Sequence, residues 1–155
     1  MTEVQENIKA SAKVEIPSAK LKDIHITDYI RESLDKVAKA EGFTNYELLV
    51  DHGSSIGDGF VGIMIKVKIQ EINSNKFLHV LAKVPPESKT TREFMKLMAF
   101  FEREVYIYNN FLPHIIEFQN EMTIKWTEGF FNFPKVFYAD YDKEKDDAII
   151  IMEDL

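Results

Sequence analysis

The chain has 155 residues, of which 45% are hydrophobic and 29% charged, and it contains no cysteine. Its 26 acidic and 19 basic residues give a formal net charge of −7, which argues against nucleic acid as a partner. The absence of cysteine excludes disulfides and thiolate metal sites, and neither a signal peptide nor an apolar run of about 20 residues occurs, so we expect a cytoplasmic chain with no membrane partner.

The N-terminal part of the chain falls into an arm and a first helix. Residues 1–22 are polar and lack sustained periodicity, which predicts a loose arm before a folded unit over residues 23–155. Between Thr27 and Glu41 apolar residues recur at helical spacing, and Gly42 follows at the position of a C-cap glycine. This pattern predicts an amphipathic helix that packs on one side of a sheet.

A hairpin follows this helix. Residues 47–52 are a short strand candidate, and residues 61–70 alternate between apolar and other side chains with a period of two. Residues 77–84 return as another strand after the Asn-Ser-Asn turn at 73–75. The two adjacent strands predict an antiparallel hairpin, which the prolines at 85 and 86 end because proline cannot donate to a strand ladder.

A long helix is expected after the hairpin. Thr90 and Glu93 have the spacing of a capping box, which predicts the first turn of a helix. The apolar stripe that begins at Phe94 holds one helical face as far as Tyr108, and Pro113 is expected to close the helix.

The rest of the chain adds two strands. Residues 114–133 show no assignable pattern, whereas 134–141 and 148–152 read as strands around an acidic turn at 142–147. The turn lacks the spacing of a calcium loop, so we expect it to be solvated. The predicted class is α+β, with about five mostly antiparallel strands, a long helix after the third strand and an extra N-terminal helix.

A glycine-rich turn stands at the head of the alternating strand. Residues 57–62 read Gly-Asp-Gly-Phe-Val-Gly, which is a G-x-G-x-x-G run. Such glycines let backbone N–H groups approach phosphate oxygens, although a glycine hairpin turn without any ligand has the same pattern. A strand and not a helix follows the glycines, which argues against a Rossmann site.

Lys83 and Glu104 are the other candidate phosphate-site residues. Lys83 closes Val-Leu-Ala-Lys at the end of a strand, where kinases place the lysine that contacts the α- and β-phosphates, although strand-end lysines are usually solvated. Glu104 lies about 20° from Leu97 around the predicted helix, at the margin of its apolar stripe. A carboxylate there is costly unless it meets a cation, and Lys83 is available. The alternatives are that Glu104 reaches water or that Glu102 takes its place.

These residues resemble the N-terminal lobe of the insect ecdysteroid kinase-like proteins, a branch related to choline and aminoglycoside kinases with the protein-kinase-like fold. The resemblance runs from about Asp28 to Leu155. Its segments are residues 57–60, Leu-Ala-Lys-Val-Pro at 81–85, Glu104-x-x-x-Tyr108 with Phe-Leu-Pro at 111–113, Phe-Pro-Lys-Val-Phe-Tyr at 133–138 and Ile-Met-Glu-Asp-Leu at 151–155.

The resemblance implies ATP as the cofactor and a small-molecule hydroxyl as the phosphoryl acceptor, with ecdysteroid alcohols the named substrate class. In this assignment the glycine turn covers the phosphates, Lys83 contacts them and Glu104 orients Lys83. Met152 lies beside the adenine, and the backbone of Glu153 and Leu155 hydrogen-bonds to the adenine edge. The nucleotide-binding residues implied are Gly57, Asp58, Gly59, Phe60, Lys83, Glu104, Met152, Glu153 and Leu155.

The catalytic half of a kinase is not apparent in these residues. None of the four histidines begins an H-x-D-x-x-x-x-N loop, no Asp-Phe-Gly occurs, and the chain ends at the hinge. We therefore expect no catalytic base, no magnesium ligands and no turnover by the chain alone. His79 and His114 are too far apart to suggest another metal centre.

Two functions remain open at this point. One is the ATP-binding lobe of a small-molecule kinase, and the alternative is a non-catalytic, kinase-derived interaction or regulatory module. With the second lobe absent, we expect an exposed apolar face near Phe131, Tyr138 and Met152 that binds a separate C-terminal lobe or promotes self-association.

Overall fold

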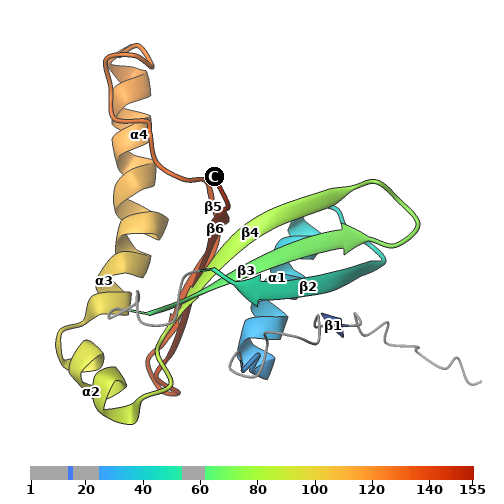
Figure 1. Cartoon of the computed structure of the whole chain (residues 1–155). Helices are drawn as coiled ribbons and strands as arrows, with labels where there is room; N and C mark the ends of the chain where they lie inside the picture. The colour runs from blue at the N-terminus through green and yellow to red at the C-terminus, as the bar shows by residue number, and fades with distance from the viewer. Residues whose placement is uncertain (1–13, 16–24, 54–61) are drawn as a thin grey trace, which may run out of the picture.

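The computed structural model describes residues 14–15, 25–53 and 62–155, and within them six strands form one twisted sheet (Figure 1). The strand order is β1-β2-β3-β4-β6-β5. The short β1 (Val14–Glu15) runs parallel to β2, and every other neighbouring pair is antiparallel. The α+β class with a mostly antiparallel sheet is therefore confirmed. Of the arm expected over residues 1–22, the structure describes β1 alone, so that prediction stays untested.

The elements follow one another as a helix, a three-stranded meander, a helical segment and a hairpin. The longer strands are β2 (Tyr46–His52), β3 (Ile63–Glu71), β4 (Phe77–Val84), β5 (Val136–Asp142) and β6 (Asp147–Glu153). The helices are α1 (Asp28–Ala40), α2 (Lys89–Leu97), α3 (Phe100–Tyr106) and α4 (Leu112–Glu121), with a π-helical turn, η1 (Ile107–Phe111), between the last two.

The first helix forms as its sequence predicts. The hydroxyl of Thr27 accepts a hydrogen bond from the backbone N–H of Ile30, and Gly42 follows the helix with a φ of 75°. A left-handed residue at that position ends a helix, and glycine adopts it without a Cβ clash. Leu34 and Val37 are fully or almost fully buried in the core between α1 and the sheet.

The β3–β4 hairpin separates the two faces of the sheet. The alternate β3 side chains Ile65, Val67 and Ile69 are buried in the core with α1. Their neighbours face the other side, and in register Met64 lies opposite Lys83 of β4. The predicted antiparallel hairpin and its period of two are confirmed, and the alternation places Lys83 on the face away from α1.

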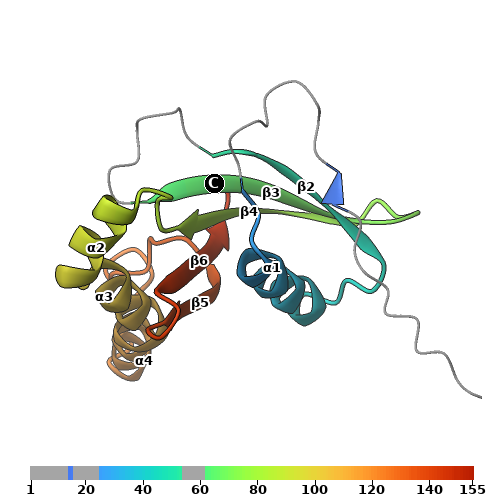
Figure 2. The same cartoon turned by 90° about the horizontal axis from the view of Figure 1, so that it is seen from below.

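Strand β6 is buried on both faces. Ile149 and Ile151 belong to the core with α1, whereas Ile150 and Met152 belong to a second core with Met95 of α2 and neighbouring residues of α3. Figure 2 shows β5 and β6 between α1 on one side and the helices α2 to α4 on the other. This double burial explains the continuous apolar run of the strand, because no face of it meets water.

The segment after β4 is not the single long helix that the apolar stripe predicts. The helix begins two residues earlier than the proposed capping box, since its N-cap is Ser88 in place of Thr90 and the side-chain oxygen of Ser88 accepts a hydrogen bond from the N–H of Thr91. It ends at Leu97, and Ala99 adopts a left-handed φ of 53° before α3 begins. The stripe is interrupted there, because Leu97 is 82% exposed whereas Phe101 is buried.

The helical segment also continues beyond Pro113, where its end was predicted. The N–H of Leu112 donates to the carbonyl of Ile107, five residues back, so a π-helical turn changes the register just before the proline. Pro113 falls in the first turn of α4, where its missing N–H costs little. The first part of the region left unassigned, residues 114–121, is therefore helix.

Figure 1 shows α3 and α4 as one column that stands beside the sheet and extends past it. Among the described residues, no helix has both the length and the apolar character needed to cross a lipid bilayer.

Candidate functional site

Lys83 reaches the site from the end of β4. It lies opposite Met64 of β3 and Ile150 of β6, at the centre of three paired strands. Its neighbours Ala82 and Val84 are buried in the core with α1. Because successive side chains of a strand point to opposite faces, the Lys83 side chain projects to the face where α3 packs.

Glu104 of α3 meets this lysine. The Nζ of Lys83 donates to both carboxylate oxygens of Glu104, at 2.8 and 2.7 Å. The side chains are 21% and 25% exposed, so the pair is largely covered. The expected ion pair is therefore formed, and the alternatives in which Glu104 reaches water or Glu102 replaces it are wrong. These two hydrogen bonds hold the lysine side chain in place, because hydrogen bonds between ionised groups are stronger than those between neutral groups.

The pair leaves the ammonium able to bind a further acceptor. A lysine ammonium carries three N–H donors, and Glu104 takes two hydrogen bonds from Lys83. The third donor suits one oxygen of an anion. The Nζ of Lys83 also lies over the ring of Phe101, 5.8 Å from its centroid. This cation–π contact stabilises the ammonium.

Tyr108 and Asn109 lie on η1, just after the helix that carries Glu104, and Tyr108 packs against the second core. Tyr108 lies one turn after Glu104, and burial, with the Glu104 charge as the second cause, raises the pKa of its phenol. The phenol therefore stays neutral beside the carboxylate at physiological pH. The Nδ2 of Asn109 donates to the carbonyl of Ala139 at 2.9 Å and ties η1 to β5. Sequence reasoning missed Asn109, because nothing in its neighbourhood along the chain marks it.

Gly62 lies directly against Lys83 at the start of β3. Its φ is 152°, and a Cβ added there would lie 3.0 Å from the carbonyl oxygen of Val84 and 3.4 Å from two methylene carbons of Lys83. A glycine is thus required for the chain to enter β3 across the lysine stem. The other glycine-turn residues, Gly57, Asp58, Gly59 and Phe60, lie outside the described residues, and their roles stay predictions.

The segment predicted to hold the adenine lies on the same sheet, two residues along β6 from the partner of Lys83. Met152 is 9% exposed and pairs with Leu81 of β4. The N–H of Glu153 donates to the carbonyl of Lys135 at 2.9 Å, so the backbone group that Glu153 could offer a base is its carbonyl. Leu155 is 92% exposed. The predicted phosphate and adenine ends are thus roughly 7 Å apart along the strand.

A groove of about 270 Å³ lies on the face of β2, β3 and β4 that is turned away from α1. Its polar lining includes Lys66, Lys68, His79 and Asp154, and Lys66 contacts Asp154 at 3.3 Å. Sequence reasoning missed this pair, although the alternation of β3 already places Lys66 on the face of Lys83.

The acidic turn at 142–147 is partly engaged by α2 and is not simply solvated. Asp147 pairs with Arg92 at 2.9 Å, and Asp146 pairs with Lys96 at 3.6 Å. Backbone N–H groups within the turn, chiefly that of Lys145, lower the pKa of Asp142. The turn therefore anchors α2 to the β5–β6 hairpin.

Comparison with known proteins gives one match. The family model described as the ecdysteroid kinase-like family matches residues 56–155, which include the glycine turn, Lys83, Glu104 and the segment 152–155. The resemblance drawn from the sequence is therefore confirmed at the level of the family. No curated protein and no solved structure matches the chain.

Proposed function

Because the chain belongs to the ecdysteroid kinase-like family, we propose that it binds ATP as the nucleotide-binding part of a small-molecule phosphotransferase. The observation that carries the proposal is the Lys83–Glu104 ion pair, 2.7 Å long, on the sheet face away from α1. Kinases use such a strand lysine, held by a helix glutamate, to grip the phosphates of ATP. The proposed acceptor is a small-molecule hydroxyl, and the name of the family suggests ecdysteroids as its class.

The nucleotide is placed by the two ends of the site. We propose that the third N–H donor of Lys83 binds a phosphate oxygen and that residues 57–60, which lie outside the described part of the chain, cover the phosphates. Its adenine lies beside Met152, with the carbonyl of Glu153 and the N–H of Leu155 at the base edge. Among the residues that the structure describes, no three carboxylates or histidines come together to suit a metal ion, so these residues do not fit a magnesium site and we propose no magnesium-dependent step for them.

Nucleotide binding without turnover is the activity that we propose for these 155 residues. They contain neither an H-x-D-x-x-x-x-N loop nor an Asp-Phe-Gly, which supply the base and the magnesium ligands in kinases. Phosphoryl transfer would then depend on residues other than these 155. We keep the cytoplasm as the proposed location, since a chain without cysteine is compatible with a reducing compartment.

Substitution of Lys83 tests the proposal. ATP at 100 times its dissociation constant stabilises a protein by about 2.7 kcal/mol, so we expect it to raise the unfolding temperature of the wild-type chain. Lys83→Ala removes a charged hydrogen bond worth about 1.5–3 kcal/mol, and ATP affinity should fall roughly 10- to 100-fold. Thermal unfolding across an ATP titration measures both effects.

Lys68→Ala is the matched control. Lys68 lies on β3 and lines the groove, with its Nζ 4.9 Å from the centroid of the Phe77 ring. It carries the same charge as Lys83 but does not contact Glu104, so ATP should still stabilise this variant. The proposal would be contradicted if ATP did not raise the unfolding temperature of the wild-type chain, or if it raised that of Lys83→Ala by the same amount.

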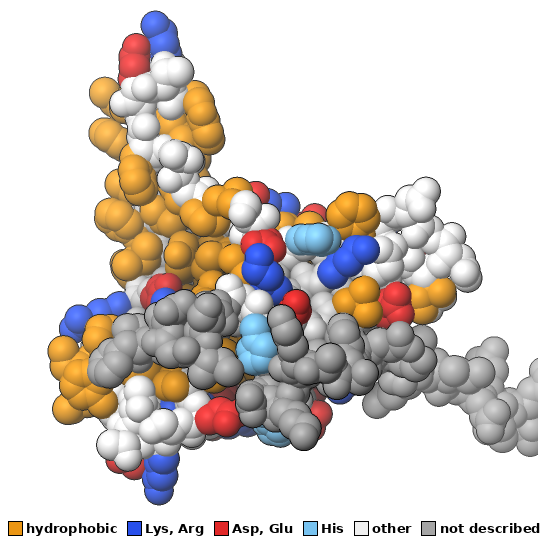
Figure 3. Space-filling model, in the orientation of Figure 1, with side chains coloured by type: hydrophobic (Ala, Val, Ile, Leu, Met, Phe, Trp, Pro, Cys, Tyr) orange, Lys and Arg blue, Asp and Glu red, His pale blue; other side chains and the backbone are white. Residues whose placement is uncertain are grey.

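The second candidate function is an interaction module, and exposed apolar side chains on the helical column favour it. Figure 3 shows hydrophobic side chains along the length of this column. We call the following residues the apolar column set: Tyr106, Ile107, Phe111, Phe118, Met122, Trp126 and Phe130, all between 43% and 70% exposed. In this function the set binds a separate lobe or a second copy, and Lys83 with Glu104 only supports the fold.

A further inference from the structure

We infer that Lys66 and Asp154 form a positioning pair, which holds the adenine-binding segment 152–155 against β3 and thereby sets the affinity for the base end of the nucleotide. The inference rests on the proposed nucleotide function. It assigns a role to two residues outside the Lys83–Glu104 pair, and it predicts that base binding and phosphate binding respond to different substitutions.

The strand register brings the pair together. Lys66 of β3 lies opposite Leu81 of β4, and Leu81 lies opposite Met152 of β6. The three residues therefore form one row across three strands, and with about 4.8 Å between neighbouring strands the backbones of Lys66 and Met152 are roughly 10 Å apart. The Lys66 side chain crosses β4 to reach Asp154, with its Nζ 3.4 and 3.3 Å from the two carboxylate oxygens.

The burial of the two side chains differs. The Asp154 side chain is 17% exposed and that of Lys66 is 48% exposed. A carboxylate that is mostly covered at the end of a strand needs a cation or donors, and Lys66 supplies the cation. Half-exposed ion pairs contribute little to global stability, so the main effect of this pair is on where the segment lies.

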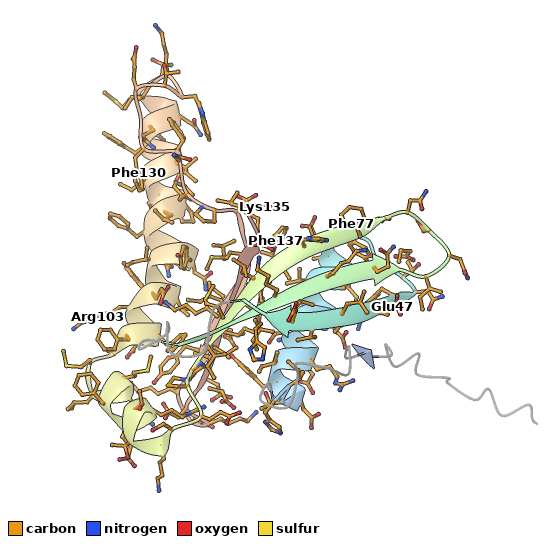
Figure 4. All side chains as sticks on the ribbon, viewed as in Figure 1. Glu47, Phe77, Arg103, Phe130, Lys135 and Phe137 are labelled. Atoms are coloured by element: carbon orange, nitrogen blue, oxygen red, sulfur yellow. The ribbon has the colours of Figure 1, made fainter. Side chains whose placement is uncertain are left out.

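The other edge of the same segment is held by Lys135, the residue before β5. The carboxylate of Glu153 accepts a hydrogen bond from the backbone N–H of Lys135 at 2.6 Å. The backbone N–H of Glu153 in turn donates to the carbonyl of Lys135. Figure 4 labels Lys135 where the chain enters β5. Glu153 and Asp154 thus reach in opposite directions across the sheet. With both contacts made, the Glu153 carbonyl and the Leu155 N–H are held in one orientation.

The phosphate end has separate support. Lys83 lies opposite Met64 and Ile150, in a different row of the sheet, and its partner is Glu104 of α3. Loss of the Asp154 charge therefore leaves the Lys83 contacts in place. This separation gives a readout that a general loss of folding would not give.

The test compares two ligands on the full chain by titration calorimetry. ATP reports both ends of the site, and inorganic tripolyphosphate reports the phosphate end alone. We expect Asp154→Asn and Lys66→Met each to weaken ATP binding by about two- to fivefold, as for an exposed or half-exposed ion pair, and to leave tripolyphosphate binding unchanged. The double variant Lys66→Asp with Asp154→Lys should recover part of the ATP affinity.

Asp51→Asn and Lys83→Ala are the controls. Asp51 lines the same groove and lies opposite Lys66 in the β2–β3 register. Its replacement therefore removes a carboxylate beside Lys66 without touching segment 152–155, and the ratio of the two affinities should not change. Lys83→Ala should weaken both ligands. If Asp154→Asn leaves the ratio unchanged, or Asp51→Asn changes it equally, the inference is overturned while the Lys83 result stands. Failure of the wild-type chain to bind either ligand overturns this inference and the proposed function together.

Discussion

Glu71, at the end of β3, organises the loop that follows α1. Its carboxylate accepts hydrogen bonds from the backbone N–H and the hydroxyl of Thr44 and from the N–H of Asn45. These donors favour the charged form, and the N–H of Asn45 is the largest cause of the lowered pKa of Glu71. The donors precede Glu71 by 26 and 27 residues, so no local pattern in the sequence identifies this residue as a cap.

The Glu71 carboxylate predicts a specific pH dependence of stability. Its folded-state pKa is lower than the ordinary value of 4.5, so its contribution is present above that pH and is lost as the pH falls through the folded-state pKa. We expect Glu71→Gln to lower the free energy of unfolding at pH 7, and its deficit against the wild type to shrink in acid. Urea unfolding at a series of pH values from 7 downwards measures this.

Glu93→Gln provides the baseline for this comparison, because it removes an exposed carboxylate from α2. Its difference from the wild type should stay small over the same range. A Glu71→Gln deficit that grows on acidification would show that the carboxylate is not stabilised by these donors.

Among the elements, the break between α2 and α3 decides where Glu104 lies. Arg92 of α2 donates to the carbonyl of Asp146 and the carboxylate of Asp147, which docks α2 on the β5–β6 turn. α3 packs instead along β5 and carries Glu104 to Lys83. One straight helix could not serve both contacts, and Ala99, with a φ of 53°, provides the bend.

Ala99 predicts an unusual response to glycine. An L-residue in the left-handed region costs about 1–2 kcal/mol, and glycine removes this cost while adding about 0.4–1 kcal/mol of freedom to the unfolded chain. We expect Ala99→Gly to raise the free energy of unfolding by up to about 1 kcal/mol. Denaturant unfolding measures the change.

Ala40→Gly is the matched control, because Ala40 ends α1 in ordinary helical conformation and is exposed. Glycine should destabilise there by up to about 1 kcal/mol. Equal destabilisation by the two substitutions would mean that Ala99 is not strained.

At the scale of the molecule, apolar surface is distributed unevenly. The β6 strand is covered on both faces, and Met152, expected at an open apolar face, is buried. Phe131 stacks on Trp126, with ring centroids 5.0 Å apart, and is only partly exposed. The seven exposed side chains of the apolar column set lie instead on α3, η1, α4 and the turns that follow α4, in the part of the molecule that extends past the sheet (Figure 1).

This surface predicts association of the isolated chain. Contiguous exposed apolar side chains favour contact with another protein surface, so we expect a concentration-dependent mass above that of the monomer. The double variant Phe111→Ser with Phe118→Ser should reduce it, because both side chains lie on the column and are 51% and 56% exposed. Sedimentation velocity at several concentrations measures the mass.

Phe77→Ser is the control, since Phe77 is 57% exposed but lies on β4, away from the column (Figure 4). It should associate as the wild type does. A wild-type chain that stays monomeric at all concentrations and binds no dye for apolar surface would exclude this role of the column.

The sequence by itself determined the elements whose signals are local. The period of two in β3, the helical spacing of α1 with its C-cap glycine at Gly42, and the buried run of β6 each follow from neighbouring residues, because a strand or helix repeats its faces every few positions. The Lys83–Glu104 pair could also be predicted, from the alternation of β4 and from the kinase-like order of a strand lysine and a helix glutamate. The helical angle from Leu97 did not contribute, because the helix is interrupted at Ala99.

Only the tertiary structure decided the contacts that join distant parts of the chain. Lys66 and Asp154 are 88 residues apart, and the bend at Ala99 depends on where α2 meets the β5–β6 turn. Such contacts arise when strands pair and helices dock, and the free energy that selects them is shared among many residues. For that reason neither the Lys66–Asp154 pair nor the helix break at Ala99 could be recognised from the residues that surround it in the sequence.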